Sequence, residues 1–150
     1  MPVAYDPADA RALKLWVVLA RAHRAMSDRA AEDVARHGLT LAEFGILEAL
    51  YHKGPMLLGE VQKRILVSSG GITYLVDRLV ERGLLERRPC AEDRRARYAA
   101  LTEAGRALVA EVFPQHAQAI ASAVGGLSAS EQATAAVLLK RLGLAAADRD

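Results

Sequence analysis

Apolar residues recur every three or four positions through much of the chain, which is the spacing of one face of an α-helix. Between residues 9 and 36 this face comprises Leu13, Trp16, Val17, Ala20, His23, Ser27, Ala30 and Val34. His37-Gly38 then predicts the end of the helix, because glycine readily adopts the left-handed conformation found at helix ends. Thr40 and Glu43 have the spacing of a capping box, so the next helix is predicted to begin there and to end near Lys53-Gly54-Pro55.

Two shorter helices are predicted next, over about residues 58–65 and 69–82, with a turn at residues 67–69 between them. Ser68 or Ser69 is the expected N-cap of the second one. Its apolar residues predict one buried stripe, made of Ile72, Leu75, Val76, Leu79 and Val80. The opposite face is predicted to meet solvent and comprises Gly70, Thr73, Tyr74, Asp77, Arg78 and Glu81.

Beyond Gly83, residues 84–88 and 97–101 are candidate strands joined by a charged tip at residues 89–96. Thr102 is positioned to cap a helix over about residues 103–124, and Ser128 to cap a last helix that runs to about residue 142. The pattern predicts one mainly α domain over residues 1–150, with a small β-hairpin.

Composition narrows the class of protein. Hydrophobic residues make up 52% of the 150 residues, which excludes a disordered chain. With a single cysteine, Cys90, no disulfide can form within the chain. The N-terminus lacks the pattern of a signal peptide, and no apolar run reaches the roughly 20 residues of a membrane helix. We therefore expect a cytoplasmic protein without a membrane partner.

Positive charge is concentrated in one segment. The formal net charge of the chain is only +2, yet residues 78–97 hold seven arginines against four acidic residues. A basic segment on a nearly neutral body is typical of proteins that bind polyanions.

The order of helix, short helix, tight turn, second helix and charged hairpin predicts a winged helix-turn-helix. In this fold the second helix enters the major groove of DNA, so its exposed face must be small and polar near its start. The hairpin would place arginines in an adjacent minor groove, whose negative potential attracts them. The residues expected at the DNA are Ser68, Ser69, Gly70, Thr73, Tyr74, Asp93, Arg94 and Arg95.

The run from Leu57 to Gly105 resembles the winged helix of the MarR family of bacterial regulators. The most specific features are Asp93-Arg94-Arg95 followed by Leu101-Thr102-Glu103-Ala104-Gly105. A closer similarity is to the branch that responds to quinones and aromatic compounds. The segments that carry it are Leu50-Tyr51-His52-Lys53-Gly54, SSGGITYLVDRL, Arg88-Pro89-Cys90 and Phe113-Pro114-x-His116.

This resemblance implies a homodimer that binds a pseudo-palindromic operator in double-stranded DNA. Residues 9–36 and 103–143 would form the dimer and residues 40–101 the winged helix-turn-helix. The positions that match the family's recognition helix are Ser68, Ser69, Thr73, Tyr74 and Arg78. Asp93 and Arg95 fall at the family's wing pair, with Arg95 in the minor groove and Arg94 at phosphate. The protein would be a repressor, released when a small aromatic ligand changes the spacing of its two recognition helices.

A ligand pocket between the dimer helices and the winged domain is one interpretation of the aromatic residues and histidines, and plain core packing is the other. The candidate pocket residues are Trp16, His23, Phe44, Tyr51, His52, Phe113 and His116.

Other functions remain as alternatives. Neighbouring arginines favour a thiolate at Cys90, so this residue is a candidate redox or electrophile sensor. The alternative is that Cys90 is an incidental cysteine on an exposed loop. The four histidines lie in different segments without the spacing of a metal site, so neither a metal nor a cofactor is expected. The motifs of nucleotide-binding, hydrolytic and metal-dependent enzymes are missing, so we expect no enzyme. A helical interaction protein that does not bind DNA would not need the arginine-tipped hairpin.

Overall fold

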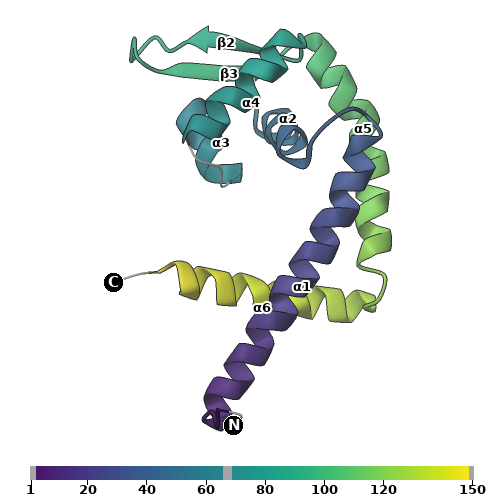
Figure 1. The fold of residues 1–150 in the computed structure, drawn as a ribbon. Coiled ribbons are helices and arrows are strands. Elements are labelled where there is room, and N and C mark those ends of the chain that lie inside the picture. Colours follow the sequence, from purple (N-terminus) through teal and green to yellow (C-terminus); the bar gives the residue numbers. More distant parts are fainter. Residues whose placement is uncertain (1–2, 66–68, 149–150) are drawn as a thin grey trace.

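The computed structural model describes residues 3–65 and 69–148, and two groups of elements make up its fold (Figure 1). One group holds three longer helices: α1 (Pro7–Ala35), α5 (Glu103–Ala123) and α6 (Ala129–Ala147). The other group holds α2 (Leu41–Lys53), β1 (Met56–Leu57), α3 (Leu58–Ile65), α4 (Ser69–Glu81), β2 (Leu85–Pro89) and β3 (Arg97–Leu101). The predicted mainly α fold with a β-hairpin wing is confirmed.

The sheet has one strand more than predicted. Its order is β1-β3-β2, and both neighbouring pairs are antiparallel. Met56 pairs with Ala99 and Leu57 with Tyr98, so the two-residue β1 covers the second edge of β3. A strand of two residues has no alternating pattern, which is why the sequence did not reveal it.

The hydrophobic core lies where α2 packs against α1, α4, α5 and the sheet. Phe44, Leu47 and Leu50 of α2 are at most 1% exposed. The stripe predicted for α4 packs into this core through Ile72, Val76, Leu79, Leu75 and Val80. The polar face of α4 is therefore left on the outside.

Helix ends follow local chemistry. The Asp6 side chain accepts a hydrogen bond from the Ala8 nitrogen at 2.7 Å, so α1 begins at Pro7, two residues before the predicted face starts at residue 9. At its other end Gly38 has a φ of +72°, in agreement with the predicted stop. The capping box of Thr40 and Glu43 is present. At the C-terminus α6 runs to Ala147, beyond the predicted end, because Leu144 and three alanines continue the helix.

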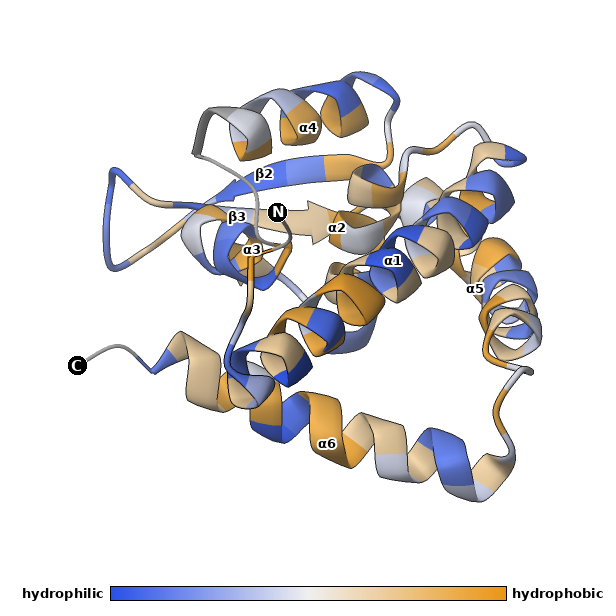
Figure 2. Ribbon diagram, turned by 60° about the horizontal axis from the view of Figure 1, so that its bottom comes forward, coloured by the Kyte–Doolittle hydropathy of each residue, from blue (hydrophilic) through white to orange (hydrophobic). Residues whose placement is uncertain are grey.

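A large apolar surface is left open by α1 and α6. Only the last part of the predicted α1 face is buried, at Ala30 and Val34. Exposed apolar side chains are Leu13, Leu15, Trp16, Val17 and Val18 on α1, and Val137, Leu138, Leu139, Leu142 and Leu144 on α6. Figure 2 shows hydrophobic stretches of the ribbon, coloured orange, on both helices.

The start of α5 is fixed to the base of the wing. The Thr102 hydroxyl donates to the Gly83 carbonyl oxygen at 2.6 Å and accepts from the Gly105 nitrogen at 3.1 Å. A Cβ at Gly105 would lie 2.1 Å from the Leu84 carbonyl oxygen, so only glycine allows this approach. The sequence Leu101-Thr102-Glu103-Ala104-Gly105 thus contains both the threonine that caps α5 and the glycine that the close approach to Leu84 requires.

The substitution Gly105→Ala is expected to lower the free energy of unfolding by about 1–3 kcal/mol, since the added methyl group forces backbone to move. Urea denaturation followed by circular dichroism measures this. The control is Gly59→Ala, because a Cβ there meets no atom within 4 Å. Equal stability of the two variants would contradict the close approach.

Candidate nucleic-acid interface

The exposed face of α4 is the first part of the candidate interface. Thr73, Tyr74, Asp77 and Arg78 are exposed, whereas Ile72, Val76 and Leu79 on the opposite face are at most 4% exposed. Ser69 and Gly70 lie in the first turn of this helix, and Ser68 lies outside the described residues. The helix thus presents the predicted polar face to solvent.

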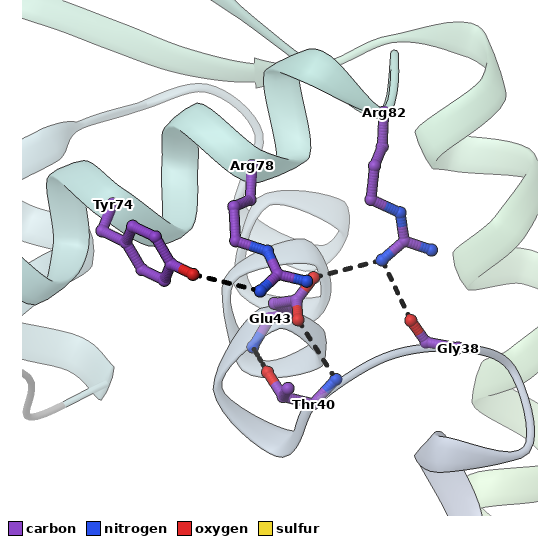
Figure 3. A network of polar contacts seen from close by, with 6 residues as sticks. All are labelled: Gly38, Thr40, Glu43, Tyr74, Arg78 and Arg82. Carbon is purple, nitrogen blue, oxygen red and sulfur yellow. Dashed lines mark hydrogen bonds and ion pairs between the residues drawn. The ribbon is translucent and has the colours of Figure 1, made fainter.

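Two members of this face hold each other in place. Arg78 donates a hydrogen bond from Nη1 to the Tyr74 hydroxyl oxygen at 3.2 Å, and its guanidinium lies 5.7 Å from the ring centre (Figure 3). The hydrogen bond to Tyr74, the nearby Tyr74 oxygen and the Glu43 carboxylate raise the pKa of Arg78. The pair combines a permanent positive charge with a flat aromatic surface, one helical turn apart.

The wing tip, residues 93–97, is the second part, and its turn is stabilised from both sides. The Asp93 carboxylate accepts from the Arg95 backbone nitrogen at 2.9 Å. Arg97 donates from Nη1 to the carbonyl oxygens of Arg94 and Ala96, at 2.8 and 2.9 Å. Asp93 thus holds the main chain of Arg95, because the turn brings that N–H to the carboxylate. The guanidinium groups of Arg94 and Arg95 are exposed.

Ion pairs occupy other arginines of the basic segment. Arg87 pairs with Asp77 of α4, Arg88 with Glu86 at 2.7 Å, and Arg82 with Glu43 at 3.1 Å. Arg94 and Arg95 at the tip therefore carry charge that these acidic residues do not offset.

Cys90 is buried just beyond the end of β2, and not on an exposed loop. The thiol lies beside Tyr98 of β3. Its electrostatic interaction and hydrogen bond with the Tyr98 phenol are the largest causes that raise the pKa of Tyr98. Redox-sensing cysteines are solvent-accessible, so the burial of this thiol argues against a sensor at Cys90.

Five of the seven candidate pocket residues lie on α2 and α5. The rings of Phe44 and His116 are 4.7 Å apart, those of His52 and Phe113 are 4.9 Å apart, and those of Tyr51 and His52 are 5.3 Å apart. Trp16 and His23 lie on the exposed half of α1 instead. Trp16 is 67% exposed, and His23 lies 3.5 Å from the Ser27 hydroxyl. The structure thus separates these two from the other five within one chain.

His116 also joins α5 to α1. Its Nδ1 lies 3.0 Å from the Asp33 carboxylate, which is 3% exposed and also pairs with Arg36. Burial by itself would raise the pKa of Asp33, but hydrogen bonds with Arg36 and His116 outweigh it and lower the pKa below its ordinary value. This pair could not be predicted from the sequence, because Asp33 belongs to no motif.

A cavity of about 490 Å³ opens beside this pair and is lined by Leu41, Ala42, Phe44, Gly45, Glu48, Ile65 and His116. A neighbouring cavity of about 250 Å³ shares Gly45, Glu48 and Ile65 with it and adds Ala49, His52 and Arg64. Over residues 3–65 and 69–148, no group of three or more histidine, cysteine, aspartate or glutamate side chains is arranged to hold a metal. Within the same ranges, no helix is long and apolar enough to cross a membrane.

Comparison with known proteins identifies this arrangement. A model described as "MarR family" matches residues 37–96. The HTH-type transcriptional regulator MhqR of Bacillus subtilis is 42% identical over 134 residues, which cover 89% of this chain and 92% of that protein. The chain belongs to the MarR family. Members of this family are DNA-binding transcriptional regulators and not enzymes.

Solved structures share most of this fold. A structure that describes how 6-hydroxynicotinic acid regulates DNA binding by Bordetella bronchiseptica BpsR has a TM-score of 0.79 and 30% identity, and covers 87% of this chain and 98% of its own. A mutant MarR from E. coli complexed with operator DNA has a TM-score of 0.81 and 25% identity, and covers 92% of this chain and 99% of its own.

Proposed function

We propose that this MarR-family regulator is a homodimeric repressor that binds a pseudo-palindromic operator and is released by a small aromatic, phenolic or quinone-type ligand. One observation carries the DNA-binding part: α4 is fixed by its apolar stripe so that Thr73, Tyr74 and Arg78 face outward, and Arg94 and Arg95 are exposed on the same winged domain. Helix α4 would enter the major groove and the wing tip the minor groove.

The exposed apolar surface of α1 and α6 supports the homodimer. A concentration of exposed apolar side chains on two helices is typical of a protein interface, and a symmetric dimer buries the same surface on both partners. The two winged domains would then present two recognition helices to successive major grooves, which requires an operator with two related half-sites.

The test is selection of duplexes from a random-sequence library by the purified protein. We expect the selected sequences to be inverted repeats whose half-site centres lie about one helical turn apart. Enrichment of single, unrepeated motifs would contradict the dimer, and no enrichment at all would contradict sequence-specific binding.

The two neighbouring cavities support the ligand. Phe44, His52 and His116 supply flat faces, and Glu48 and His116 supply polar groups suited to a phenol or quinone oxygen. The space lies between α2 and α3 of the winged domain, and His116 of α5 borders the larger of the two cavities. A ligand there would favour a state in which the recognition helices are wrongly spaced for the operator. The similarity to the quinone-responsive branch and the BpsR structure support the same class of ligand.

The variant Cys90→Ser is expected to respond to ligand as the wild type does, because the buried thiol is far less reactive than an exposed thiolate. The measurement is release of a selected duplex by hydroquinone under nitrogen and, separately, by benzoquinone. Hydroquinone lacks an electrophilic carbon and tests reversible binding alone. Loss of the benzoquinone response in the variant would instead favour a thiol-based sensor.

A further inference from the structure

The Glu43 carboxylate is buried beneath the recognition helix. Glu43 is 1% exposed and lies in the first turn of α2, not on α4. One oxygen accepts from the Thr40 backbone nitrogen at 3.4 Å and completes the capping box. The other accepts from Arg82 Nη1 at 3.1 Å. Glutamine would serve the cap equally well, so the cap does not explain the negative charge.

Arg82 connects three elements through this carboxylate. It follows the last residue of α4, and the same Nη1 atom donates to the Gly38 carbonyl oxygen at 3.0 Å. Gly38 belongs to the turn after α1, and Glu43 to the start of α2. The C-terminal end of the recognition helix is thereby tied to the end of a long helix from the other group of elements (Figure 3).

The charge also acts along the exposed face of α4. Figure 3 shows the Arg78 and Arg82 side chains, one helical turn apart, both directed from α4 toward Glu43. Arg78 in turn holds the Tyr74 hydroxyl at 3.2 Å. A single buried carboxylate therefore faces two arginines, one of which orders an aromatic side chain on the predicted DNA-reading face.

Apolar packing alone leaves the helix angle less defined. The stripe of α4 makes non-directional contacts with the core, and packed helices can slide over one another by small amounts. The Glu43 side chain of the pair is 1% exposed and the Arg82 side chain 35%. Ion pairs that are taken partly out of water add little net stability compared with apolar residues of the same size, but their hydrogen bonds are directional. The pair is thus better suited to fixing geometry than to stabilising the fold.

We propose that Glu43 and Arg82 act as positioning residues, a clamp that fixes the angle of α4 to α1 and aligns Arg78 and Tyr74 for sequence-specific reading of DNA. This inference rests on the DNA-binding function proposed above and adds residues to it that lie behind the DNA-facing surface. The inference makes a distinctive prediction for removal of the Glu43 charge. If only electrostatics acted, removing a negative charge near DNA would strengthen binding, whereas loss of the clamp should weaken sequence-specific binding.

The test compares Glu43→Gln and Arg82→Lys with the wild type. Glu43→Gln retains the cap and removes the charge, whereas Arg82→Lys retains the charge and removes the planar guanidinium. For each protein, affinity is measured for a duplex selected from a random library and for a scrambled duplex of equal length. We expect the ratio of the two affinities to fall about 2- to 30-fold in each variant. The double variant should be no worse than either single variant, since both changes break one contact.

The ratio separates positioning from folding, because loss of folded protein lowers both affinities equally. If Glu43→Gln does not fold, Arg82→Lys carries the test. The control is Glu111→Gln, which removes an exposed carboxylate from α5, outside the winged domain, and should leave the ratio unchanged.

Three outcomes would overturn the clamp. The first is an unchanged ratio in both variants. The second is an equal loss on both duplexes for Arg82→Lys with a smaller salt dependence, which would make Arg82 a phosphate contact. The third is a rise in both affinities for Glu43→Gln. A wild-type protein that fails to distinguish the selected duplex would overturn the proposed DNA reading itself, and the clamp with it.

Discussion

Replacing Leu138 and Leu142 of α6 by glutamate is expected to produce a monomer and to lower affinity for a selected duplex by at least about 100-fold. Both side chains are exposed in the single chain, at 46% and 38%, and lie one helical turn apart. Two carboxylates introduced into an apolar interface lose hydration without gaining partners. The winged domains would then bind half-sites separately and lose the advantage of being linked.

Sedimentation equilibrium at micromolar concentration reports the monomer, and a mobility shift reports the affinity. Lys140→Glu is the matched control, since it makes the same change in charge on the same helix, roughly opposite Leu138. A double variant that remains dimeric, or a monomer that binds with wild-type affinity, would contradict the role of α6.

Arg95→Ala is expected to weaken binding of the selected duplex by about 2–6 kcal/mol per dimer, because each lost base-edge contact costs about 1–3 kcal/mol and the dimer has two wings. The turn should survive the change, since Asp93 holds the backbone nitrogen of residue 95 and not its side chain. The loss should be greater on the selected duplex than on a scrambled one, because a minor-groove arginine responds to groove width.

Titration at several salt concentrations measures both affinities. Arg88→Ala is the control: it removes the same charge from the wing, but Arg88 is already paired with Glu86. We expect it to have the smaller effect. Equal losses for the two variants would show that the wing contributes only general positive charge.

Local patterns predicted most of the winged domain. The buried stripe of α4, the capping box at Thr40 and Glu43 and the stop at Gly38 each depend on residues close in sequence, and the structure has all three. Bonds between distant segments were not predictable in this way. Arg82 and Glu43 are 39 positions apart, and His116 and Asp33 are 83 apart, and no spacing rule links them.

Periodicity also predicted more burial than one chain provides. Leu13, Trp16 and Val17 continue the face that Ala30 and Val34 bury, yet they are exposed. The period of a helix shows which side chains share a face, but not whether the same chain covers that face. Among the candidate pocket residues, Trp16 and His23 lie on the exposed part of this face, whereas the rings of Phe44 and His116 pack against each other.

The order of strands in the small sheet bears on how the protein behaves at high concentration. Its two outer strands are β1, only two residues long, and β2, which carries Arg87 and Arg88 and ends in Pro89. Short length, positive charge and proline each hinder a strand from pairing with another molecule. The hairpin can therefore extend far into solvent without becoming a template for fibrous aggregates.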